Sequence, residues 1–161
     1  KQFLVMFVAV LLVLLEVGLA QWPFFYGASP LLSLIFMYFI MIYDDELMPI
    51  MTVFIMGLIA DFLMSDILGG RATALMLLSY AMRVGVVRVP QSDFMDLWAG
   101  FAVSCTAVML FQLFVFAVVH FAVPSLSPLL FQLGFTLILF PIGFVMMFSL
   151  QRLLQSLQMM R

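Results

Sequence analysis

The feature that most constrains this chain is a series of long apolar stretches that follow one another from end to end. They cover residues 3–20, 24–43, 47–65, 72–88, 97–121 and 126–150. A helix needs about 20 apolar residues to cross the hydrocarbon core of a bilayer, and each stretch is close to that length. Because 67% of the 161 residues are hydrophobic and only 9% are charged, little chain is left for a soluble domain. The pattern predicts an all-α integral membrane protein, with residues 1–161 forming a single transmembrane domain, a six-span helical bundle.

The positive charges predict the orientation of this bundle. Short cytoplasmic loops of membrane proteins carry an excess of Lys and Arg. If the N-terminus is cytoplasmic, all but one of the 6 cationic residues fall on the cytoplasmic side, the exception being Arg71. The residues on that side are Lys1, Arg83, Arg88, Arg152 and Arg161. We therefore expect both termini to be cytoplasmic.

Two acidic residues interrupt the apolar stretches, Glu16 in the first and Asp61 in the third. An ionisable side chain inside the hydrocarbon is costly, so each marks a candidate functional site. Counting from the cytoplasmic start of its stretch, each lies about 20 Å into the membrane at 1.5 Å per residue. We expect both in one layer of the outer half of the membrane, with Asp66, Arg71 and His120 nearby.

Arg71 opens the fourth stretch, where the helix macrodipole disfavours a positive charge. It therefore needs an acidic partner, and we predict Asp61. The simplest interpretation is a buried pair that fixes how the third and fourth helices pack. The same residues would also suit a proton or ion relay. A third interpretation is an outward-facing site for a small molecule or lipid, bordered by Glu16, Asp61, Arg71 and His120.

Small and polar residues recur at helical spacing in two of the stretches. Gly57, Asp61 and Ser65 are four residues apart and so share one face of a helix. Gly100 and Ser104 form a similar pair in the fifth stretch. Small residues allow close helix contacts in membranes, so we interpret both rows as contact faces for another helix.

Prolines lie inside two of the predicted spans, at Pro30 and Pro141. Proline has no backbone N–H, so the carbonyl four residues before it loses its helical partner. Each proline is predicted to kink its helix and to leave a carbonyl that a neighbouring helix must satisfy.

Motifs for catalysis and cofactor binding are missing from the sequence. We find no nucleophile elbow, phosphate-binding loop or zinc-ligand cluster, and His120 has no second ligand at metal-binding spacing. With a formal net charge of −2, the chain also lacks the basic surface of a nucleic-acid-binding protein. We therefore expect no enzymatic activity, no metal, no cofactor and no nucleic-acid partner.

The segment from Gly57 to Arg71 resembles the core of the rod shape-determining protein MreD family. The shared pattern is a Gly, three further residues, an Asp near the end of a span, and a Leu-Gly turn before the next span. In this chain the pattern falls on Gly57, Asp61 and Leu68-Gly69. The family is also similar in size and hydropathy over the whole chain.

This resemblance implies a non-enzymatic, multi-pass protein of the bacterial inner (cytoplasmic) membrane. It would be a scaffold of the elongasome, or Rod complex, that binds the membrane-anchored protein MreC and supports cell shape and lateral peptidoglycan synthesis. The wider assembly implied includes MreB, RodA and its transpeptidase. In this interpretation Asp61 and Arg71 are architectural, and the small-residue rows face lipid and receive the transmembrane helix of MreC.

The family is also similar in fold to the substrate-binding subunits of energy-coupling-factor transporters, which are six-span helical bundles. This second similarity implies an alternative function, a membrane subunit that binds a small molecule or lipid.

Overall fold

The computed structural model describes residues 2–23, 29–43, 45–64, 67–85, 93–121 and 126–159, with side chains in the last range as far as residue 146. All regular structure in these residues is helical, which confirms the predicted all-α class. The elements are α1 (Gln2–Ala20), α2 (Leu32–Tyr43), the short 3-10 helix η2 (Asp45–Leu47), α3 (Ile50–Met64), α4 (Gly70–Arg83), α5 (Phe94–His120) and α6 (Leu126–Met159).

The helices fall into two length classes. Within the described residues, three are long and apolar enough to cross a membrane: α1, α5 and the Leu126–Met146 part of α6. In contrast, α2, α3 and α4 have only 12, 15 and 14 residues. At 1.5 Å per residue they are about 18–22 Å long, whereas the hydrocarbon core is about 30 Å thick. The structure thus supports a membrane protein with three long apolar helices and three short ones.

The second predicted span, 24–43, is longer than the helix it contains. α2 begins at Leu32, two residues after Pro30, whose carbonyl accepts a hydrogen bond from the Leu32 N–H. Pro30 therefore precedes the helix, and the predicted kink at this position is wrong. The physical reason is that proline fits readily just outside a helix N-terminus, where its missing N–H breaks no helical hydrogen bond.

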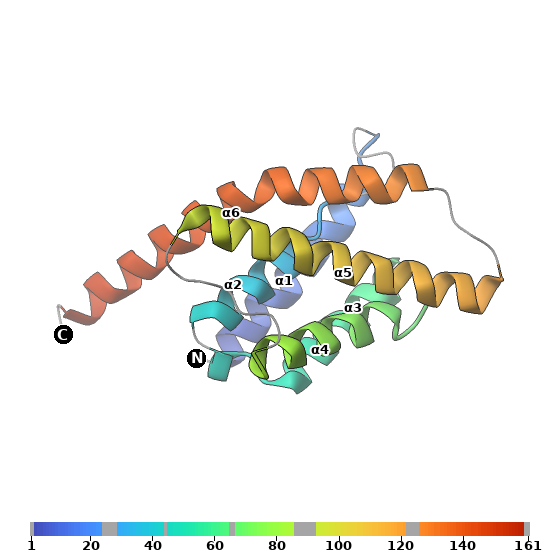
Figure 1. The fold of residues 1–161 in the computed structure, drawn as a ribbon. Helices are drawn as coiled ribbons and strands as arrows, with labels where there is room; N and C mark the ends of the chain where they lie inside the picture. Colours follow the sequence, from blue (N-terminus) through green and yellow to red (C-terminus); the bar gives the residue numbers. More distant parts are fainter. Residues whose placement is uncertain are drawn as a thin grey trace.

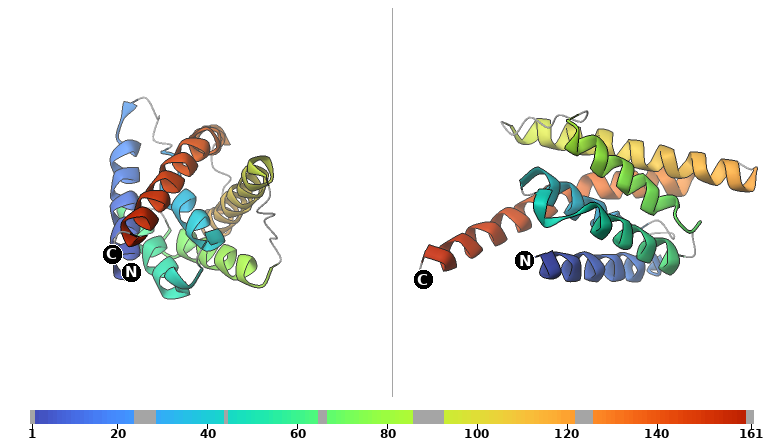
Figure 2. Two further views of the ribbon diagram at one scale, coloured as in Figure 1. Left: turned by 90° about the vertical axis from the view of Figure 1, so that its left-hand side faces the viewer. Right: turned by 90° about the horizontal axis from the view of Figure 1, so that it is seen from below.

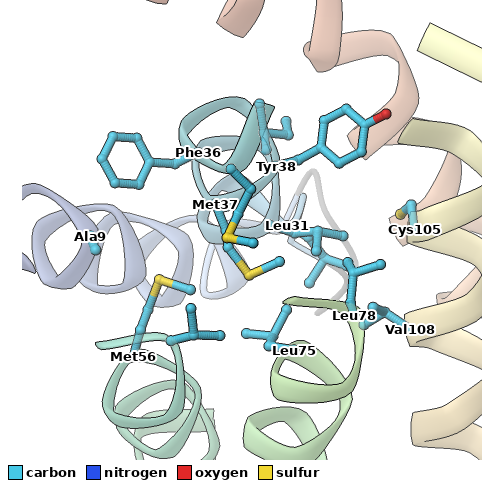
Figure 3. Close-up of a cluster of buried hydrophobic side chains, with 14 of the residues drawn as sticks. Ala9, Leu31, Phe36, Met37, Tyr38, Met56, Leu75, Leu78, Cys105 and Val108 are labelled. Carbon is cyan, nitrogen blue, oxygen red and sulfur yellow. The ribbon is translucent and has the colours of Figure 1, made fainter. Parts of the chain in front are cut away.

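α2 is the central helix of the bundle. The other helices pack in an open arc, with contacts α1 to α3, α3 to α4, α4 to α5 and α5 to α6, while α2 contacts α1, α4, α5 and α6. Figure 2 shows α2 inside this arc in the end-on view. Eight of its 12 residues are buried, and in Figure 3 Phe36 and Tyr38 point to opposite sides of it. A helix that is apolar all round suits this position.

An aromatic cluster joins α2 to α5 and α6. The Phe101 ring of α5 stacks on the Phe140 ring of α6 at a centroid distance of 4.2 Å. Tyr38 of α2 meets both rings edge-on, at 5.3 Å and 6.0 Å. The Tyr38 hydroxyl donates a hydrogen bond of 3.3 Å to the Leu97 carbonyl. The aromatic stacking and this hydrogen bond together hold α5 and α6 against the central helix.

α3 and α4 cross at Gly57. A Cβ atom at this glycine would lie 2.4 Å from Cα and 2.9 Å from the backbone nitrogen of Ala72. Backbone atoms cannot rotate aside as a flexible side chain would, so only glycine allows this approach. The predicted role of Gly57 in a close helix contact is confirmed, and the partner is α4 of the same chain.

The carbonyl released by Pro141 is satisfied as predicted. α6 continues through Pro141, which leaves the Leu137 carbonyl without its usual N–H donor. The indole Nε1 of Trp98 on α5 donates a hydrogen bond of 3.2 Å to that carbonyl. α6 changes direction in its second half, and its C-terminal end lies at the same end of the bundle as the start of α1 (Figure 1).

Replacing Gly57 with alanine should lower the free energy of unfolding by about 1–3 kcal/mol, because the new methyl group forces two backbones apart. Gly18→Ala is the matched control, since a Cβ there meets nothing within 4 Å. The control should be neutral or gain up to about 1 kcal/mol from helix propensity. Unfolding of both variants in mild detergent, followed by circular dichroism, makes the comparison. Equal stability of the two would contradict the close crossing.

Trp98→Phe should destabilise the protein by about 1–2 kcal/mol, because it leaves the half-buried Leu137 carbonyl without a protein donor. In a Pro141→Ala background the restored backbone N–H can bond this carbonyl, so the same substitution should cost less. A double-mutant cycle of unfolding free energies measures the coupling. Additive effects would show that Trp98 does not serve the carbonyl released by proline.

Candidate functional site

A buried ion pair joins α1, α2 and α4. The Arg71 guanidinium on α4 donates through Nη2 to Glu16 Oε1 on α1, forming a salt bridge. The same nitrogen donates to Ser33 Oγ on α2 at 3.2 Å. The Ser33 hydroxyl in turn donates to Glu16 Oε2 at 2.9 Å. These three side chains form a closed hydrogen-bonded triangle that links three helices.

The prediction that the Arg71 side chain pairs with Asp61 is wrong, because its acidic partner is Glu16. Asp61 contacts Arg71 through the backbone: the Arg71 N–H lies 3.1 Å from Oδ1 and 3.2 Å from Oδ2. Arg71 is in the first turn of α4, so its N–H is a free helix-terminal donor facing α3, while its long side chain reaches across to α1. Glu16, Asp61 and Arg71 were expected close together, and they are, because Arg71 contacts both acids.

Asp61 caps the N-terminus of α4 from a different helix. Its Oδ2 accepts hydrogen bonds from the backbone N–H groups of Gly69 at 2.9 Å and Ala72 at 3.2 Å, in addition to Arg71. Gly69 is the residue before the helix and has φ of 91°, a left-handed conformation that favours glycine. The Leu68-Gly69 turn thus aims the start of α4 at Asp61, and the Leu68 side chain is left exposed.

Glu16 plays the corresponding part at the start of α2. Its Oε2 accepts a hydrogen bond of 3.3 Å from the backbone N–H of Ser33, in the first turn of that helix. A carboxylate is favoured near the positive end of a helix dipole. Each acid therefore lies at the N-terminus of one short helix, Asp61 at α4 and Glu16 at α2, and Arg71 supplies the compensating positive charge.

The site is closed rather than open to solvent or lipid. Glu16, Asp61 and Arg71 have relative exposures of 0%, 1% and 4%. Among the described residues, the buried side-chain polar atom without a hydrogen-bond partner is the Ser29 hydroxyl, which is outside this network. A buried charge is tolerated when it is paired or fully hydrogen-bonded. Arg71 and Glu16 form an ion pair, and the Asp61 carboxylate accepts hydrogen bonds from the backbone N–H groups of Gly69, Arg71 and Ala72.

Glu16, Asp61, Arg71 and His120 do not border one outward-facing pocket. His120 is exposed at the C-terminal end of α5, where its ring stacks on Phe116 at 4.2 Å, while the other three residues are buried. Asp66, which was expected in the same layer, lies outside the described residues.

Gly57, Asp61 and Ser104 of the two small-residue rows lie inside the bundle, whereas Gly100 is half-buried. Gly57 and Asp61 are buried between α3 and α4, and Ser65 lies outside the described residues. Ser104 is only 1% exposed and donates a hydrogen bond of 2.8 Å to the Gly100 carbonyl of its own helix. The expectation that these rows face lipid is therefore wrong for Gly57, Asp61 and Ser104, because packing within the chain already uses them.

Sequence reasoning missed Ser33 and Thr136. The Thr136 hydroxyl of α6 accepts a hydrogen bond of 3.0 Å from the backbone N–H of Leu31, just before α2. Ser33, in the first turn of α2, donates a hydrogen bond to Glu16 and accepts one from Arg71. The available signal was Pro30, because donors that follow a proline at a buried helix start need acceptors from elsewhere in the chain.

Comparison with known proteins adds no relative: no protein-family model, curated protein or solved structure matches the chain.

Breaking the ion pair should be strongly destabilising. Glu16→Gln or Arg71→Met alone should lower the unfolding free energy by about 3–5 kcal/mol, because each leaves an unpaired buried charge. The double variant should be more stable than the sum of the single losses implies. A double-mutant cycle measured by unfolding in detergent tests this, and Asp96→Asn, at an exposed position on α5, is the surface control. Purely additive single losses would argue against a direct interaction.

Proposed function

We propose that all six helices cross the bilayer and that both termini face the cytoplasm. The start of α1 and the end of α6 lie at one end of the bundle, which is consistent with an even number of crossings (Figure 1). The distribution of Lys and Arg favours the cytoplasm for that end. The proposed location is the bacterial inner membrane.

In that membrane, the protein would act as a non-enzymatic scaffold of the elongasome that binds the transmembrane helix of MreC. Cell-shape maintenance and lateral peptidoglycan synthesis, with RodA, its transpeptidase and MreB in the wider assembly, follow from the family resemblance. The observation that supports the proposal is that the residues of the shared motif make structural contacts between helices. Gly57, Asp61, Gly69 and Arg71 all hold helices of this chain together.

This use of the charged residues favours a scaffold over a transporter or a ligand-binding subunit. A relay needs a titratable group that can exchange protons along a path, and a binding site needs polar atoms directed at the ligand. Here both Asp61 oxygens accept backbone N–H groups, and both Glu16 oxygens contact Arg71 or Ser33. These contacts fix the positions of α1 to α4, as expected of a framework that presents an outer surface to a partner.

The docking surface for MreC would lie on the outside of the bundle. Because Gly57, Asp61 and Ser104 are buried, the partner helix would meet larger apolar side chains on the outer faces. α1 exposes a row of such side chains: Phe3, Leu4, Phe7, Leu11, Leu14 and Leu15. Helix association in lipid depends on close van der Waals packing, which exposed side chains of this kind can supply.

Co-purification in mild detergent with MreC from the same genome tests this function. The scaffold proposal predicts a stoichiometric complex and no complex with an unrelated single-span protein. Recovery of the folded chain without MreC would contradict it. A ligand screen for thermal stabilisation would then test the binding-subunit alternative, since a ligand raises stability with its concentration.

Asp61→Asn should lower both the amount of folded protein and the yield of the MreC complex, because an amide lacks the charge that stabilises the α4 N-terminus. The expected loss of stability is about 1–3 kcal/mol. Asp96→Asn, the same change at an exposed position in the first turn of α5, should cost less than about 1 kcal/mol and leave the complex yield unchanged. Size-exclusion chromatography and cell shape after replacement of the genomic copy provide the readouts. Normal complex yield and normal cell shape with Asp61→Asn would remove the architectural role of this residue.

A further inference from the structure

The short helices α3 and α4 are shorter than the hydrocarbon core of a bilayer is thick. α3 and α4 pack against each other as a hairpin, with 15 and 14 residues. They are about 21–22 Å long, whereas the 27 residues of α5 extend about 40 Å. The hairpin therefore falls about 8 Å short of a hydrocarbon core about 30 Å thick.

The hairpin is in direct contact with the surroundings of the bundle. Apolar side chains are exposed along both helices: Met51, Ile55 and Phe62 on α3, and Met76, Leu77 and Tyr80 on α4. In a membrane, such side chains face lipid tails. The short helices α3 and α4 are thus part of the lipid boundary, unlike α2, which is surrounded by other helices.

Charged groups flank the hairpin near its base. Glu46 is exposed just before α3, and Arg83 in the last turn of α4 donates a hydrogen bond of 2.7 Å to the Met48 carbonyl. Moving a charged side chain into hydrocarbon is costly, whereas thinning a bilayer has only a modest cost per ångström. The charges therefore favour a bilayer that adapts to the hairpin.

We propose that the lipid bilayer thins locally around the α3–α4 hairpin, so that both ends of the hairpin lie at the two lipid–water interfaces. The partner of this face is the bilayer itself, compressed to about 21 Å on this side. The long helices α5 and α6 meet lipid of ordinary thickness, so the protein imposes a gradient of hydrophobic thickness around its circumference. From the proposed function this inference takes only the six crossings, and MreC binding is not involved.

Spin-label depth measurements in dioleoylphosphatidylcholine vesicles test the proposal. Single cysteines replace Leu68 at the tip and Val84 at the base of the hairpin, both exposed, in a Cys105→Ala background. Each label should be more accessible to a water-soluble nickel complex than to oxygen, which concentrates in the hydrocarbon. A label on Leu77, midway along α4 and also exposed, should show the opposite preference.

Labels at Phe94, the first residue of α5, and at Phe121, which directly follows α5, are the matched control and should be accessible to nickel at both ends. If they behave so while the Leu68 or Val84 label shows the oxygen preference of Leu77, the hairpin enters an unthinned bilayer from one side and the proposal is overturned. Because the α5 labels report insertion independently, this result would leave the membrane location and MreC binding intact.

Discussion

The bundle depends on two buried carboxylates, each placed at the start of a short helix. Inside a packed bundle, the first backbone N–H groups of a helix cannot reach water, so the protein itself must supply acceptors for them. Asp61 does this for α4 and Glu16 for α2. Arg71 pairs with Glu16, and Ser33 completes the network. Four helices are thereby held in one arrangement around the centre of the molecule.

This network also explains why the chain can contain helices too short for an ordinary bilayer. α2 is surrounded by other helices, and the backbone N–H groups of Leu31 and Ser33 at its start are hydrogen-bonded to Thr136 and Glu16. α3 and α4 expose apolar side chains on the outside of the bundle, and their close crossing at Gly57 lets the Asp61 carboxylate reach the first turn of α4. A rigid inner framework with an apolar exterior of uneven thickness suits a protein whose proposed role is to hold another membrane helix in place.

Part of this arrangement could be predicted, because it follows from residue spacing along the chain and from the hydrogen-bonding capacity of single residues. Counting residues along alternating spans placed Glu16, Asp61 and Arg71 in one layer, and the missing N–H of Pro141 required a donor, which is Trp98. The side-chain partner of Arg71 could not be predicted in this way. Glu16 is 55 residues away along the chain, and only the packing of α1 against α3, which in turn packs against α4, brings it within reach.

The sequence alone predicts an all-helical membrane protein with buried charged residues. The length of an apolar stretch and the free-energy cost of burying a charge both follow from residue type. Tertiary structure decided which face each small residue uses. From the sequence, Gly57 and Ser104 could have faced lipid, a partner or the interior. In the structure both face the interior of the bundle. The tertiary structure also decided where α2 begins, since a helix can start in an apolar interior only where other helices provide acceptors such as Glu16 and Thr136.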